Sequence, residues 1–93
     1  QQGLSSVYAA ESGANVALGR LKAGAMGNQS FTLSVNGRWV KVTVTDTSAS
    51  RTEGVILSTA SDAEGGYKRT VRITYMSEEH EGQRILTVTN VSS

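Results

Sequence analysis

The sequence predicts an α+β domain in which an N-terminal helix packs on an antiparallel β-meander of about four to five strands. Over residues 1–25 the apolar residues recur every three or four positions, which is the period of one helix face. Over residues 30–91 they recur at every second position in several short segments, which is the period of a strand. With 93 residues, ten glycines and no proline, the chain fits one such domain with tight turns, and we expect residues 1–93 to form it.

The predicted helix carries a narrow apolar stripe made of Leu4, Val7, Tyr8, Ala14, Ala17, Leu18 and Leu21. Gly13 and Gly19 lie inside this helix, where each costs about 1 kcal/mol relative to alanine. Close packing against another backbone would explain why both glycines are tolerated. Lys22 and the glycines that follow it suit a helix C-terminus, so the helix should end between Leu21 and Met26.

A first β-hairpin is predicted around Asn36-Gly37, because both central residues of a type I′ turn need a positive φ. A two-residue loop there pairs Val35 with Arg38. It also brings the alternating apolar residues of both strands to one face of the hairpin, which we expect to join the core: Phe31, Leu33, Val40 and Val42.

The remaining strands are predicted from the same alternation. Residues 46–54 lack hydrophobic periodicity and are expected to form a loop. A second hairpin should follow, with strands over 55–61 and 67–76, a glycine turn at 64–66, and Val71 and Ile73 in the core. An acidic turn over 77–83 then precedes a last strand over 84–91. The register of that strand stays open, since Ile85 and Leu86 cannot both face the core.

Charge and composition exclude several classes of partner and chemistry. The formal net charge of +1 nominates neither nucleic acid nor an anionic membrane surface. The absence of cysteine removes disulfides, thiolate nucleophiles and cysteine metal sites. The apolar runs are far shorter than the ~20 residues of a membrane helix, so the chain as given is expected to be soluble.

Catalysis is not expected from this sequence. His80 is the only histidine, and it lies in a charged turn between glutamates, without the partners of a triad or a closed metal shell. No nucleophile-elbow motif surrounds Ser58 or Ser61, so a hydrolase that uses a serine with His80 is the weakest hypothesis. Asp62 and Glu64 could contribute oxygens to calcium, but they are only two carboxylates. We therefore expect no cofactor and no metal site.

Trp39 and Tyr67 are the plausible exposed aromatic residues. A sheet face that carries both could stack on a sugar or a peptide, which would make the domain a free-standing glycan-binding or peptide-binding module. The simpler interpretation is that both rings cover a sheet face or a helix end.

Two segments resemble minor pilins and pilus-assembly proteins of the type IV pilin-like superfamily. The first is YAAESGANVALGRLKAG, which is similar to the second half of their N-terminal helix. The second is VILSTASDAEGGYKRTVRIT, a strand ending in Ser-Thr, a glycine turn, and Arg-Thr-Val opening the next strand. Together the two segments cover less than half of the chain. The resemblance implies a pilin-like fold, with residues 1–25 as the back half of a longer helix and residues 30–91 as the sheet.

The resemblance also implies a function. Such proteins carry a basic leader and an apolar membrane anchor of about 25 residues, so we expect an apolar segment to precede Gln1 in a longer protein. The chain would be a structural subunit of a type IV pilus, or a pseudopilin of a type II secretion system. It would reside in the bacterial inner membrane and periplasm before assembly and in a surface filament, with roles such as adhesion, afterwards. Its partners would be other pilin or pseudopilin subunits, contacted by the loops over 46–54 and 78–83, here through Arg51, Glu53, Glu79 and His80.

Overall fold

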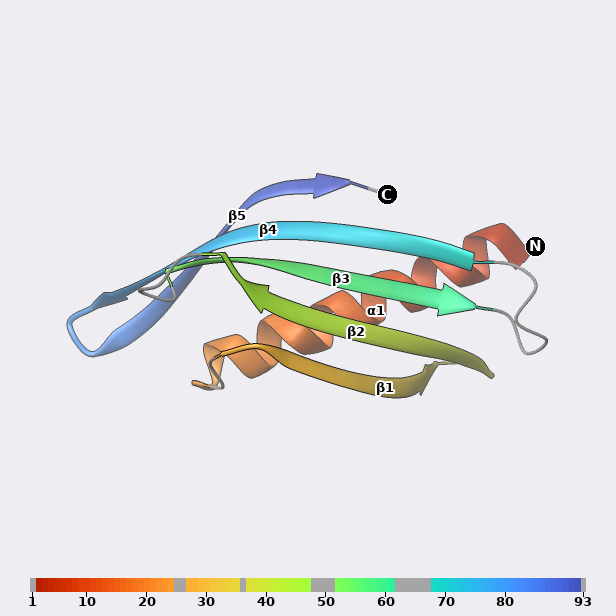
Figure 1. Cartoon of the computed structure of the whole chain (residues 1–93), viewed down its shortest axis with the longest axis horizontal. Helices are drawn as coiled ribbons and strands as arrows, with labels where there is room; N and C mark the ends of the chain where they lie inside the picture. Colours follow the sequence, from red (N-terminus) through yellow and green to blue (C-terminus); the bar gives the residue numbers. More distant parts are fainter. Residues whose placement is uncertain (1, 25–26, 36, 48–51, 62–67, 93) are drawn as a thin grey trace.

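The computed structural model describes residues 2–24, 27–35, 37–47, 52–61 and 68–92, with side chains described from residue 8 onward. Helix α1 (Gln2–Lys22) precedes five strands: β1 (Gln29–Val35), β2 (Arg38–Asp46), β3 (Glu53–Ser61), β4 (Lys68–His80) and β5 (Gln83–Ser92). Each strand pairs antiparallel with the next, giving a sheet in the order β1-β2-β3-β4-β5 (Figure 1). The domain is therefore elongated along its strands, with extents of 45 × 20 × 19 Å.

The fold class predicted from the sequence, a pilin-like domain built around a long helix laid on the meander, is wrong. The described structure is a five-stranded antiparallel sheet with one helix of 21 residues. Its strands, of 7, 9, 9, 13 and 10 residues, make up the larger part. The physical reason is the distribution of apolar volume, because the large buried side chains lie on strands while the buried helix residues are mostly alanines. No helix in the described ranges has the length and apolar character needed to cross a membrane.

Small residues form the buried face of α1. Ala9, Ala10, Ala14, Ala17 and Leu21 are buried against the sheet, which fits an i, i+3, i+4 pattern. Leu18 is half-buried, whereas Tyr8 is exposed, so the predicted stripe was wrong at Tyr8 and missed the first two alanines. The side chains of Leu4 and Val7 lie outside the described part.

The two helix glycines differ in their surroundings. A Cβ at Gly13 would lie within 3 Å of side-chain atoms of Ser58, Val40 and Val42, so the absence of a side chain lets α1 approach the sheet. A Cβ at Gly19 would meet nothing within 4 Å. The predicted packing against another backbone is therefore replaced by close packing on side chains at Gly13, and it is wrong at Gly19.

The first hairpin has the register that the sequence predicts. Val35 pairs with Arg38, Leu33 with Val40, and Phe31 with Val42, and Gly37 has a φ of 80°. Asn36 lies outside the described residues. Val40 and Val42 are fully buried, but Phe31 and Leu33 are only half-buried, because β1 lies at the edge of the sheet.

The later strands are longer than predicted, at the expense of the connections. β2 runs to Asp46 and β3 begins at Glu53, so parts of the expected 46–54 loop belong to strands. β4 continues through Glu78 and Glu79 to His80, and only Glu81 and Gly82, both with positive φ, form the turn to β5. The acidic segment is therefore strand, because the hairpin ladder stabilises its backbone even where its side chains are exposed. The expected glycine turn at 64–66 lies outside the described residues.

The two faces of the sheet differ in chemistry. The face toward α1 holds most of the core: Val40, Val42, Val44, Ile56, Ala60, Val71, Ile73 and Tyr75. The opposite face is rich in threonine and carries Lys41 and Arg72. Two hydroxyl pairs join its neighbouring strands, Thr59 to Thr70 at 3.1 Å and Thr74 to Thr89 at 3.0 Å.

Candidate functional site

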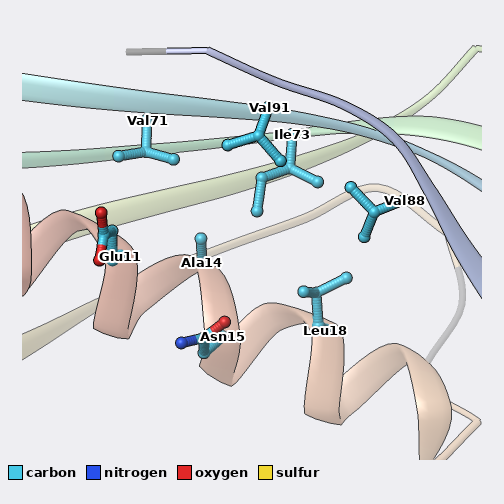
Figure 2. A pocket seen from close by; sticks show the side chains of 8 residues that line it. All are labelled: Glu11, Ala14, Asn15, Leu18, Val71, Ile73, Val88 and Val91. Carbon is cyan, nitrogen blue, oxygen red and sulfur yellow. The ribbon is translucent and has the colours of Figure 1, made fainter.

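An apolar groove runs between α1 and the last two strands, β4 and β5. Its volume is about 290 Å³. Side chains of α1 form one wall, and valine and isoleucine side chains of the two strands form the other and point toward the helix (Figure 2). The lining residues are Glu11, Ala14, Asn15 and Leu18 from α1, Val71 and Ile73 from β4, and Val88 and Val91 from β5.

The strand wall of the groove is buried at β4 and exposed to solvent at β5. Val71 and Ile73 are buried at its floor, but Val88 is 43% exposed and Val91 is 60% exposed. Leu18 faces the valines from the helix (Figure 2) and is half-buried. Exposed valines scattered singly over a surface are ordinary, whereas apolar side chains that continue one another along a hollow are typical of a binding surface.

A β-bulge in β5 turns both valines into the groove. Asn90 pairs with Thr74 and Val88 pairs with Tyr75, which leaves Thr89 as an extra residue in the ladder. Residues three apart in a regular strand point to opposite faces, so Val88 and Val91 can share a face only because of this extra residue. The Thr89 hydroxyl donates to the carbonyl oxygen of Thr74 at 3.2 Å, which holds the bulge in place.

The turn end of the β4–β5 hairpin is held by Arg84. Its Nη1 donates to Ser77 Oγ at 2.5 Å, and its Nη2 lies 3.5 Å from Glu79 Oε1. Ser77 is buried, and its backbone N–H donates to the carbonyl oxygen of Thr52 at 2.7 Å. The sequence leaves the register of β5 open; in the structure Leu86 packs against the core and Ile85 is exposed.

The predicted loop contacts that the structure describes lie on strands. Glu53 begins β3, and Glu79 and His80 lie near the end of β4, so none is in the loop where it was expected. His80 is exposed, with Nε2 4.0 Å from Oε1 of its neighbour Glu81. Arg51 lies outside the described residues.

Within the described ranges, the candidate metal ligands and catalytic residues do not come together in a site. No group of three His, Asp or Glu side chains there is placed to hold a metal ion. The calcium candidates Asp62 and Glu64 lie outside those ranges. Ser58 is fully buried beneath Gly13. Its partner Val71 is nine residues from His80 along β4, roughly 30 Å at the rise of a strand, so Ser58 and His80 do not form a pair.

Trp39 is 61% exposed on the face of the sheet that points away from α1. Its cross-strand neighbours are Ser34 and Ser61. Tyr67, its expected partner in a stacking platform, lies outside the described residues. Among the described side chains of that face no second aromatic ring accompanies Trp39.

Tyr75 is buried on the core face and forms part of a second hollow, of about 460 Å³, at the start of β3. Burial, and secondarily the charge of Asp46, raise the pKa of Tyr75 above its ordinary value of 10.0. Its ring lies over Gly54, the residue opposite it in the β3–β4 ladder. Of the described residues that line this hollow, Glu53 is the charged one, and they form no acid–base pair.

The raised pKa makes the stability of the domain fall at alkaline pH. Below about pH 10, Tyr75 is protonated in both the folded and the unfolded chain, and its titration has no effect. Above that pH the unfolded chain loses this proton first, so the free energy of unfolding should decrease as the pH rises toward the folded-state pKa. Urea unfolding at a series of alkaline pH values would measure the slope. Tyr75→Phe should have a shallower slope, and an equal slope in both proteins would contradict the assignment.

The comparisons with known proteins give no family for this chain. No family model matches it, and neither the curated proteins nor the solved structures contain a significant match. The groove was not predicted from the sequence. The one available signal was the uncharged run ILTVTNVS in the last strand, whose valine spacing fits a single face only if a bulge is assumed.

Proposed function

We propose that the chain is a structural subunit of a type IV pilus or a related secretion filament, as a minor pilin or a pseudopilin. It acts by binding neighbouring subunits and has no substrate. The observation that carries the proposal is the groove with Val88 and Val91 exposed along it, because such a surface suits another protein. The reason for proposing a filament is the resemblance of its first helix and of residues 55–74 to minor pilins.

The described polar groups support a binding role over a catalytic one. Among the described residues that line the groove, one is charged, Glu11, and one is an amide, Asn15, both on its exposed helix wall. Active sites bring an acid, a base or a nucleophile into a desolvated cleft, and the groove offers no such pair. Subunit interfaces instead need an apolar centre with a polar rim, which is how Val88, Val91 and Leu18 are arranged with Glu11 and Asn15.

The filament function is tested in cells that produce the whole protein. An epitope-tagged copy should be found in the membrane fraction before assembly, and in filaments released by shearing. Immunogold labelling should then place the tag on the filaments. A tagged protein that is expressed but absent from both the membrane fraction and the sheared filaments would contradict the proposal. The gene sequence upstream of Gln1 gives a second test, since an apolar segment behind a basic leader is expected there.

A further inference from the structure

Strand β5 is an edge strand with few of the devices that protect such edges. It is ten residues long, and among the described strands it has only β4 as a neighbour. Its residues 85–92 carry no charge and contain no proline, and five of these eight residues are β-branched. Natural edge strands are commonly blunted by lysine, proline or short length, so β5 is open to pairing with another strand, with the bulge at Thr89 as its one irregularity.

The opposite edge of the sheet is better protected. Strand β1 has only seven residues, and the guanidinium of Arg20 lies 4.0 Å from the ring centroid of Phe31. The inner face beside β1 is therefore covered by a cation, which a strand added at that edge would have to desolvate. Beside β5 the inner face is the apolar groove, so an added strand would cover Val88 and Val91. The two edges thus differ in how readily they can pair with another strand, and β5 is the edge that favours pairing.

We propose that β5 and the groove form the contact with a second copy of this chain, the two β5 strands running antiparallel about a two-fold axis. Each copy would add a strand to the sheet of the other and cover its Val88 and Val91. This inference rests on the proposed function in that it takes the neighbour to be a subunit, and it assigns the surface through which subunits meet.

The charge distribution identifies a second copy as the occupant. A two-fold contact places the same strand opposite itself, so any charge on it would face a like charge. Residues 85–92 are uncharged and therefore self-compatible. A nucleic acid or an acidic peptide would find no complementary group there, since Glu11 is the one charged side chain among the described residues that line the groove. Backbone pairing supplies directional hydrogen bonds, and the four valines of the two copies supply the apolar centre.

The test measures self-association and its dependence on the two valines. Sedimentation velocity of the 93-residue chain over about 1 μM to 1 mM should show a monomer–dimer equilibrium. Val88→Lys/Val91→Lys should raise the dissociation constant at least 100-fold, because four ammonium groups would meet at the axis. A matched control is Val16→Lys/Leu57→Lys, since Val16 and Leu57 are 40% and 41% exposed and line no part of the groove. The control should dimerise like the parent chain.

A mixing experiment keeps the test independent of any effect on folding. Val88→Glu/Val91→Glu should be monomeric alone, and should form a one-to-one dimer with the lysine variant. Hydrogen exchange of the parent chain should slow at the β5 amides as the concentration rises. A parent chain that stays monomeric at about 1 mM, a dimer unaffected by the lysines, or protection at β1 in place of β5 would each overturn the inference. A monomeric domain found in filaments would refute this contact alone, and a dimer absent from filaments would refute the filament function alone.

Discussion

Gly13→Ala is expected to destabilise the domain although alanine is the better helix former. The added Cβ would lie 2.5 Å from Ser58 Oγ, 2.6 Å from Val40 Cγ1 and 2.9 Å from Val42 Cγ2. All three residues are fully buried, so none can swing into solvent to make room. Overpacking a core costs about 1–3 kcal/mol, against about 1 kcal/mol gained in helix propensity. We expect a net loss of up to about 2 kcal/mol in the free energy of unfolding, and more for Gly13→Val.

Gly19→Ala is the matched control for this prediction. It makes the same chemical change in the same helix, but its Cβ would meet nothing within 4 Å. The helix propensity gain should then appear undiminished, as a stabilisation of up to about 1 kcal/mol. Each kcal/mol corresponds to about 4–8 °C in melting temperature for a domain of this size. Melting temperatures that shift in the same direction for both variants would contradict the close approach of α1 to β2 and β3.

Tyr75→Ala and Gly54→Ala are the second pair with a large expected effect. Tyr75 is 3% exposed, and its ring atoms occupy the position that a Cβ at Gly54 would take. Removing a buried aromatic side chain costs about 3–5 kcal/mol, the value known for phenylalanine and tryptophan. Gly54→Ala would displace the ring from its place and should cost about 1–3 kcal/mol by overpacking.

The double variant separates the ring contact from the effect of each residue alone. With the ring removed, the alanine at position 54 has space, and its lower backbone entropy in the unfolded chain should favour folding. The two free-energy changes should therefore be non-additive, with a coupling of about 0.5–3 kcal/mol that makes the double variant more stable than the sum predicts. Urea unfolding of the four proteins measures the cycle. Additive changes would show that Tyr75 does not pack on Gly54.

The first hairpin was the part of the fold most fully determined by local sequence. Gly37 and the alternation of Leu33, Val35 and Val40 each specify the same register, and the structure has it. The end of the helix was also predictable, because Lys22 and Gly24 are local signals. Local signals failed at the acidic segment around Glu79, since a strand that is held by a neighbouring strand tolerates residues with low strand propensity.

The candidate site could not be predicted because it depends on long-range pairing. The alternation in residues 84–91 is compatible with two registers, and only the ladder with β4 places Leu86 toward the core and Ile85 outside. The groove requires in addition that α1 leave the inner face beside β5 open. The sequence predicts a contact surface at the charged hairpin end, but Glu79 there is paired with Arg84. The exposed apolar side chains lie instead on the uncharged strand next to it.

Because Thr89 is an extra residue in the ladder, the residues that β5 presents to a partner depend on the length of the strand as well as on its composition. A related chain could keep every valine of this strand and yet, by gaining one residue between Thr89 and Asn90, present Asn90 and Ser92 to α1 and turn Val91 toward the threonine-rich side. Single-residue insertions here would therefore act as specificity changes, and would separate chains that associate from chains that do not. In related chains, the spacing between the two valines at this position therefore matters more than the identity of the residues between them.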